Sequence, residues 1–353
     1  MAFRTKRSQV AILLAINLIL CSLLVVGVEL LFGDWFVPYV SPDAAIVDRR
    51  LTYRQNLYEP ASDVVYVRDG YGLRGVHEPL RAIELVTVGG STTDQRYITE
   101  GETWQDVLRA LTHIPLANAG VDGMSSYGHI VAVSEWLHKI PDLSPRNYLH
   151  YIGVNDASLS GDTGRFDAPG RDTAWWRKIL RRSVIARGAS RLWLRMAGAR
   201  EVNHGRIGIP TDASDMAMIK LAIDRDAVND FVKTCYIPNL RKLLDLHKQR
   251  NEFVIFVNQA VNPAVVKWED GEPLLASQFS TFKQFALELA QINAATEAVC
   301  KASPNDCRFI DLAGRVKFDR DDFYDLVHTT PAGSAKIGRF LAGELAYLRR
   351  GPS

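Results

Sequence analysis

The stretch ELVTVGGSTTD, residues 84–94, places a short apolar run directly before a glycine pair and a serine. The run 84–88 is rich in β-branched side chains, which predicts a buried strand. Gly89 and Gly90 end this strand, so Ser91 begins the segment that leaves it. Ligands of parallel sheets bind at the carboxyl ends of the strands. Ser91 therefore lies where a functional site is expected.

Outward from this stretch, predicted strands alternate with predicted helices. Further strands are expected near residues 114–117, 148–153, 253–257 and 308–312. Helices are expected over residues 102–111, 126–138, 278–301 and 332–348. This alternation predicts an α/β fold with a parallel sheet that helices cover on both faces.

Three more segments place polar or glycine residues just after a strand or just before the last helix. They are Asn118-Ala119-Gly120, Gly153-Val154-Asn155-Asp156 and Asp325-Leu326-Val327-His328. Because the carboxyl ends of parallel strands share one edge of the sheet, these segments should meet Ser91 at a common rim.

This set of residues can carry out acyl transfer. A serine hydroxyl needs a base to remove its proton, and His328 can act as that base for Ser91. Asp325, three residues earlier, can orient the imidazole and stabilise its charged form. The oxyanion of the tetrahedral intermediate needs preorganised donors. The N–H groups of Ser91 and Gly120 and the side-chain amide of Asn155 are the candidates.

The four blocks, in this order, resemble the SGNH (GDSL-like) hydrolase family, and the resemblance covers residues 85–348. It implies a flavodoxin-like three-layer α/β/α fold and ester hydrolysis with no metal and no cofactor. It also implies site residues, namely Ser91, Gly120, Asn155 and His328, with Asp325 completing the catalytic triad.

One position departs from the family pattern: Gly90 stands where many members have aspartate before the serine. The chain is closer to bacterial Gly-Gly-Ser-Thr-Thr variants that resemble glycan-modifying enzymes. The resemblance implies a serine esterase or transferase that acts on O-acyl groups, foremost O-acetyl, of a cell-surface or exported polysaccharide through an acyl-enzyme on Ser91. A lysophospholipase or thioesterase, and a non-catalytic glycan-binding scaffold subunit, are the alternatives.

The amino terminus has the pattern of a membrane anchor. Arg4, Lys6 and Arg7 precede a run, residues 10–28, that has no charged side chain. At about 1.5 Å per residue, such a helix nearly spans a hydrocarbon core of about 30 Å. We expect residues 1–9 in the cytoplasm, a single membrane span over 10–32, and an extracytoplasmic, periplasmic domain. A cleaved signal peptide is the alternative, although no small-x-small site follows the run.

Residues 33–80 lack periodicity and are expected to form a stalk and a surface-packed segment before a hydrolase domain over 81–353. Residues 157–212 interrupt the alternation. They contain Trp175, Trp176 and Trp193, and eight basic residues without an acid between 177 and 200. Three interpretations remain open for 175–200: solvated amphipathic helices, an interfacial helix on anionic lipid, or a groove for an acidic polysaccharide.

The net charge and the cysteine and histidine spacing limit the partners and metals that we expect. The 353-residue chain has a net charge of only +2, and with an exported domain nucleic acid is not an expected partner. No zinc-ligand spacing occurs. Cys300 and Cys307 are near enough in sequence to pair in an oxidising compartment, but spacing alone leaves this open. Cys21 and Cys235 complete the set of four.

Several polar residues near the rim receive structural interpretations. Packing or solvent exposure is expected for His129, His138 and His150, and helix capping for Asp94 and Asp156. Gln259 follows the strand predicted at 253–257, where it either lines the site or only packs.

Overall fold

The structure is a computed structural model of the chain. It describes residues 2–36, 49–157, 179–180, 182–196, 217–221, 230–269 and 272–349. Most of the predicted insertion, including Trp175 and Trp176, lies outside these residues.

The core is a five-stranded parallel sheet. Its strands are β3 (Leu85–Gly89), β4 (Leu116–Gly120), β5 (Asn147–Ile152), β7 (Phe253–Asn258) and β10 (Cys307–Ile310). The spatial order is β10-β7-β5-β3-β4, and every neighbouring pair is parallel. The first core strand thus lies between the second and the third, which is the flavodoxin-like order. The predicted α/β fold class is confirmed.

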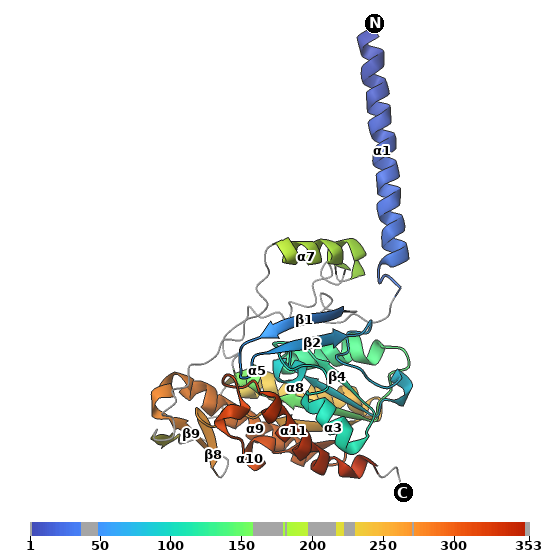
Figure 1. The fold of residues 1–353 in the computed structure, drawn as a ribbon. Coiled ribbons are helices and arrows are strands. Elements are labelled where there is room, and N and C mark those ends of the chain that lie inside the picture. The colour runs from blue at the N-terminus through green and yellow to red at the C-terminus, as the bar shows by residue number, and fades with distance from the viewer. Residues whose placement is uncertain are drawn as a thin grey trace.

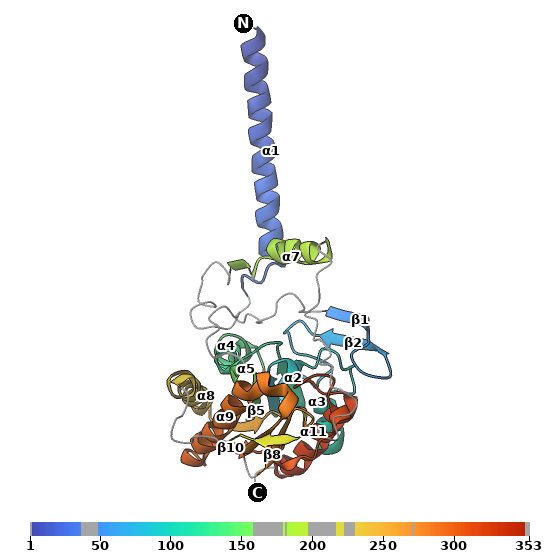
Figure 2. The same cartoon turned by 90° about the vertical axis from the view of Figure 1, so that its left-hand side faces the viewer.

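Both faces of the sheet are buried, as expected for parallel strands. On one face Tyr148 and Ile152 of β5 belong to an apolar cluster with α4 (Ser126–Val131), α8 (Ile237–Lys248) and α9 (Lys283–Ala302). On the other face Leu149 and Tyr151 pack in a cluster with α3 (Trp104–Thr112), α10 (Leu312–Arg315) and α11 (Pro331–Glu344). Figures 1 and 2 show these helices around the sheet. Because alternate side chains of β5 point to opposite faces, helices pack on both sides of the sheet, and the architecture has three layers.

Short helical turns complete the elements. Two four-residue helices, α2 (Ser91–Asp94) and α5 (Val154–Ala157), begin just after β3 and β5. Short 3-10 or π-helical segments cover Leu80–Ala82, Ala132–Trp136, Leu137–Lys139, Val232–Tyr236, Ser277–Phe282, Arg320–Asp322 and Ala346–Arg349. The helix predicted over 126–138 is therefore only partly α-helical, and the one predicted over 278–301 becomes regular only at Lys283.

A hairpin before the first core strand changes the predicted domain boundary. Strands β1 (Arg49–Gln55) and β2 (Ser62–Arg68) pair antiparallel. Leu73 and Arg74 beyond them are buried, and the Arg74 N–H donates to the Asn118 carbonyl at 2.8 Å. The segment is thus part of the folded domain, so a boundary at residue 81 is too late.

Two further elements were not predicted. One is α8, whose buried Leu240, Leu243 and Leu244 do follow the helical spacing of i, i+3 and i+4. The other is a small antiparallel sheet in the order β6 (Met218–Lys220), β9 (Glu272–Ala276) and β8 (Val266–Glu269). Near these elements Cys300 and Cys307 form a disulfide with Cα atoms 5.1 Å apart, which joins the end of α9 to the start of β10.

Two helices lie apart from the sheet. Helix α1 (Ala2–Phe32) contains an apolar stretch, Gln9–Phe32, that is long enough to cross a membrane and has no buried residue. It projects away from the domain (Figure 1). Helix α7 (Val184–Met196) lies across the end of α1 nearest the domain (Figure 2).

Candidate active site

Three predicted residues form one continuous hydrogen-bonded chain. His328 Nε2 lies 2.7 Å from Ser91 Oγ, and His328 Nδ1 lies 2.6 Å from Asp325 Oδ2. Because a carboxylate accepts only, Nδ1 carries the proton. Nε2 then accepts from the Ser91 hydroxyl. This is the arrangement of a nucleophile, a base and an orienting acid.

The Asp325 carboxylate is held charged despite its burial. Burial alone would raise its pKa. The side-chain hydrogen bond and positive charge of His328, with the N–H groups of His328 and Val327, outweigh burial and lower the pKa. Those two N–H groups donate to Oδ1 at 2.7 and 2.9 Å. The His328 ring also stacks on Tyr324, with centroids 5.5 Å apart and planes 8° apart. The imidazole is therefore fixed in orientation from two sides.

Ser91 is the first residue of α2, directly after β3 and Gly90. The first N–H groups of a helix have no acceptor within it, so the Ser91 N–H is placed to bind a developing negative charge. A Cβ at position 90 would overlap Asn155 Nδ2 and would lie 3.3 Å from the Met124 carbonyl oxygen. Glycine at 90 thus allows Asn155 to lie beside the nucleophile.

Asn155 lies in α5, the short helix that follows β5, and β5 is the neighbour of β3 in the sheet. Its Nδ2 donates to the Met124 carbonyl at 2.9 Å. This bond fixes the side-chain amide next to the Gly90–Ser91 peptide. The predicted position of Asn155 at the same rim as Ser91 therefore agrees with the geometry.

Gly120 does not lie as predicted for an oxyanion donor. Its N–H donates to Asn118 Oδ1 at 2.8 Å, and its carbonyl accepts from Arg68. The peptide is buried at the end of β4, where a Cβ would overlap the backbone of Thr93 and Asp94. The role of Gly120 is close packing of β4 against α2. The prediction of an oxyanion donor at this residue is wrong, because its N–H already has an internal acceptor.

The turn that follows β4 lies closer to the nucleophile. The Met124 N–H donates to the Val121 carbonyl at 3.2 Å, and Gly123 between them has a φ of 75°. Its neighbour Met124 is the residue whose carbonyl holds Asn155. A left-handed glycine at this turn is the signal that pattern reasoning missed.

Gln259 joins two of the loops that carry the site. Its Nε2 donates to Thr92 Oγ1 at 2.5 Å, and its Oε1 accepts from the Val154 N–H at 2.5 Å. Thr92 follows the nucleophile and Val154 precedes Asn155. Gln259 is buried and is therefore a positioning residue that sets the distance between the two loops.

A buried ion pair supports α2 from the hairpin side. Arg68 Nη2 lies 2.8 Å from Asp94 Oδ1, which also accepts from the Tyr66 hydroxyl at 2.7 Å. Both charged side chains are 1% exposed, so the two charges neutralise each other away from water. The predicted capping role of Asp94 is replaced by this pair. Asp156, in contrast, does hold a helix start, because it accepts from the Ser126 N–H at 3.0 Å.

The nucleophile and its base are largely buried. Ser91 is 8% exposed, and the side chain of His328 is 12% exposed. Two hollows in the described surface have volumes of about 700 and about 1000 Å³, and neither is lined by Ser91 or His328. The one of about 1000 Å³ reaches Tyr324, whose ring stacks on His328.

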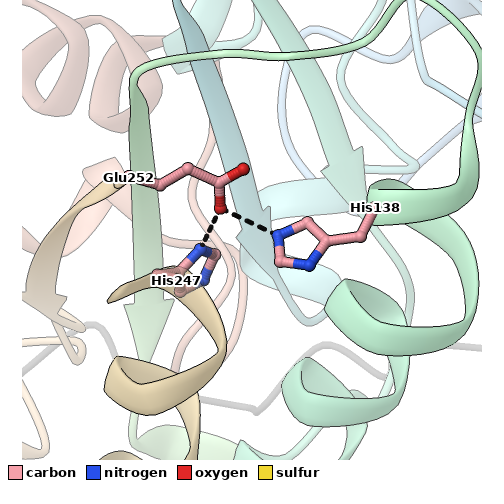
Figure 3. A group of neighbouring side chains, drawn as sticks. All are labelled: His138, His247 and Glu252. Atoms are coloured by element: carbon pink, nitrogen blue, oxygen red, sulfur yellow. Dashed lines mark hydrogen bonds and ion pairs between the residues drawn. The ribbon is translucent and has the colours of Figure 1, made fainter. Parts of the chain in front are cut away.

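A second polar cluster lies away from the triad. The Glu252 carboxylate oxygen Oε2 is 2.8 Å from both His138 Nε2 and His247 Nδ1 (Figure 3). The chain continues inward, since His247 Nε2 lies 3.0 Å from His150 Nε2, and His150 Nδ1 lies 3.0 Å from His129 Nδ1. Packing is confirmed for His129 and His150.

This cluster has a group of three ligand-type side chains that could hold a metal ion, His138, His247 and Glu252. Their ligand atoms are already matched by hydrogen bonds to one another. Glu252 accepts both protons, and its other oxygen accepts from Arg250 Nε at 3.0 Å. Three side chains thus donate to the Glu252 carboxylate, and we assign the cluster a structural role.

Comparisons with known proteins give distant structural similarity. No family model matches the chain, and no curated protein matches its sequence. A GDSL-like lipase from Bacteroides thetaiotaomicron is 14% identical, with a TM-score of 0.41 over 77% of this chain and 92% of that one. A member of the lipolytic G-D-S-L family from Veillonella parvula is also 14% identical, with a TM-score of 0.41 over 74% and 96%.

A carbohydrate esterase family 2 enzyme from Corynascus thermopiles is 12% identical, with a TM-score of 0.42 over 82% of this chain and 72% of that one. Sequence identities and TM-scores of this size do not define an activity. The chemistry is therefore derived from the side chains of the site.

Proposed function

We propose that the chain is a serine esterase of the SGNH type, with Ser91 as its nucleophile. The observation that carries this proposal is the continuous hydrogen-bonded chain from Ser91 Oγ through His328 to Asp325. A structural serine does not need a histidine whose second nitrogen is paired to a buried carboxylate. The non-catalytic scaffold is disfavoured for the same reason.

The reaction follows from the protonation states. His328 Nε2 takes the Ser91 proton as Oγ attacks the ester carbonyl carbon, and the imidazolium is stabilised by Asp325. The tetrahedral intermediate collapses, the alkoxide leaves with the proton from Nε2, and an acyl-enzyme remains on Oγ. Water or a sugar hydroxyl then loses its proton to Nε2 and attacks the acyl carbon, which restores Ser91. The acceptor decides between hydrolysis and transfer.

We place two donors around the oxyanion, the Ser91 N–H and the Asn155 side-chain amide, which the Met124 carbonyl holds beside Gly90. Donors set in advance at the developing charge lower the barrier to acyl transfer.

The substrate we propose is an O-acylated, foremost O-acetylated, polysaccharide at the cell surface or in export. The Gly-Gly-Ser-Thr-Thr sequence at residues 89–93 supports this substrate class, because it is similar to that of variants that resemble glycan-modifying enzymes. The membrane-length helix α1 is the observation that favours the alternative, a lysophospholipase or thioesterase.

We also propose that α1 is an uncleaved anchor in the bacterial cytoplasmic membrane and that the catalytic domain is periplasmic. The basic residues before the span support this orientation. The Cys300–Cys307 disulfide supports an oxidising compartment. A reporter enzyme fused after Ser353 that is active only in the periplasm supports this topology, and one active only in the cytoplasm overturns it.

The test of the activity uses the full-length protein in detergent micelles with p-nitrophenyl esters of graded chain length. We expect turnover that falls as the acyl chain lengthens from acetate, and labelling of Ser91 by a fluorophosphonate. A preference for long chains would replace the glycan proposal by the lipid alternative. No turnover and no labelling, in protein whose circular dichroism shows a fold, would leave the scaffold interpretation.

A further inference from the structure

Helix α7 is tied to the end of α1 by one carboxylate. Glu29, in the last turn of α1, accepts from the Ser183 hydroxyl at 2.6 Å and from the N–H groups of Val184 and Ile185 at 3.2 and 3.0 Å. These are groups at the start of α7 that have no acceptor within that helix. Glu29 therefore caps α7 although it is more than 150 residues away in the sequence.

A second set of contacts fixes the direction of α7. The Asp34 N–H donates to the Arg182 carbonyl at 2.9 Å, and Arg182 Nη1 donates to the carbonyls of Asp34 and Trp35 at 3.0 and 3.2 Å. Arg187, one turn into α7, forms an ion pair with the Asp34 side chain. Contacts at both Glu29 and Asp34 hold α7 across the end of α1, as Figures 1 and 2 show from two sides.

The sequence of α7 is amphipathic. Ile185, Ala189 and Leu192 follow a spacing of four and three residues, which places them on one face, with Trp193 beside them. The sequence of α7 also contains Arg187, Arg191 and Arg195 at intervals of four. Ile185, Leu192 and Trp193 are 43%, 58% and 67% exposed, so the protein itself does not cover this apolar face.

We infer that α7 lies in the surface of the bilayer that α1 crosses, with its exposed apolar side chains in the headgroup–acyl boundary. The inference rests on the proposal that α1 spans the membrane. An amphipathic helix with arginine on its polar face and tryptophan at its apolar edge is the type that binds this layer. Its position at the end of a membrane-length helix selects lipid as the partner.

The consequence is a second attachment of the domain. Residues 33–48 connect α1 to the hairpin, whereas α7 belongs to the segment between β5 and β6. The chain thus reaches the membrane surface at two places that are far apart in its sequence. Anchoring by a span together with an interfacial helix restricts the domain more than a single tether does.

The test measures the fluorescence of Trp193 in the full-length protein in nanodiscs. We prepare discs of anionic lipid brominated near the headgroup or near the chain end, and compare the protein with its Trp193→Phe variant. We expect headgroup-proximal bromine to remove a tryptophan signal that the variant lacks. Equal quenching of the two proteins would overturn the inference.

Two further variants make the test specific. Leu192→Asp should reduce the quenching of Trp193, whereas Ile219→Asp, at an exposed apolar residue of β6, should leave it unchanged. The fate of α1 is measured separately, by the mass of the amino-terminal peptide and by retention of the protein in the discs. A retained protein with unquenched Trp193 contradicts only the α7 inference. Loss of the amino-terminal peptide contradicts the anchor itself.

Discussion

Gln259 Nε2 donates to Thr92 Oγ1 at 2.5 Å, which links the end of β7 to the helix that starts with the nucleophile. The same side chain accepts from the Val154 N–H, next to Asn155. Ser91 and Asn155 come from different strands, so their separation depends on this bridge.

We therefore expect Gln259→Ala to lower kcat about tenfold or more with little change in KM, because a misplaced oxyanion donor affects the transition state more than the ground state. Gln284→Ala, at an exposed residue of α9, is the control. We measure steady-state kinetics of both variants and compare preparations that have the same melting temperature. A kcat equal to that of the control would show that Gln259 only packs.

Ser91→Ala and His328→Ala should each abolish ester turnover while the melting temperature stays near that of the parent. The two groups act as one proton-transfer unit, so the double variant should be no slower than either single one. Residual rates of all three, measured at high enzyme concentration, check this. A double variant that is much slower than both would mean that serine and histidine act independently.

Asn155→Ala should lower kcat about a hundredfold or more, the size seen on removing one oxyanion donor, and leave KM nearly unchanged. Gly90→Ala should have a similar effect, because its Cβ would displace the Asn155 amide. Melting temperature and kcat are measured on the same preparations. If Asn155→Ala is destabilised but fully active, the oxyanion is stabilised by backbone donors alone.

Acid should destabilise the fold through the buried histidines. Burial lowers the pKa of His129 to about 3, and burial also lowers the pKa of His150 and His247. In the unfolded chain these histidines bind protons once the pH falls below their ordinary pKa of 6.5. In the folded chain they stay neutral at that pH. The stabilisation is therefore complete above about pH 6.5 and is lost as the pH falls toward the folded values.

Glu252 adds to the same trend at lower pH. Burial alone would raise its pKa, but hydrogen bonds from His138 and His247 outweigh burial and lower the pKa to about 2. Its contribution is present above 4.5 and is lost as the pH falls toward 2. We expect His129→Leu to flatten the fall in melting temperature between about pH 7 and about pH 5. His113→Asn, at an exposed position, should keep the parental slope.

The sequence allowed the sheet and the triad to be predicted because both depend on local patterns. A buried strand before Gly89 and the Asp325-x-x-His328 spacing need only a few neighbouring residues. The donor at the end of β4 was misassigned because the acceptor of the Gly120 N–H is a side chain, Asn118 Oδ1, whose orientation no pattern gives.

Long-range pairs account for the other misses. Arg68 and Arg74 are buried, and Asp94 and Glu100, which neutralise them, lie 26 residues further along. The Gln259 bridge spans 167 residues. Such partners are fixed by the folded arrangement of the elements and leave no spacing signal.

The Arg68–Asp94 pair sets a limit on how the protein can be shortened. A chain that begins at residue 81 keeps Asp94 but removes Arg68 and Tyr66, so the buried carboxylate would lose its 2.8 Å ion pair and would retain only Arg96, whose Nε lies 3.9 Å away. Breaking one side of a buried pair typically costs about 3–5 kcal/mol, which is a large part of the stability of a domain. A soluble version for crystallisation or screening should therefore omit α1 and retain the whole hairpin, beginning before Arg49.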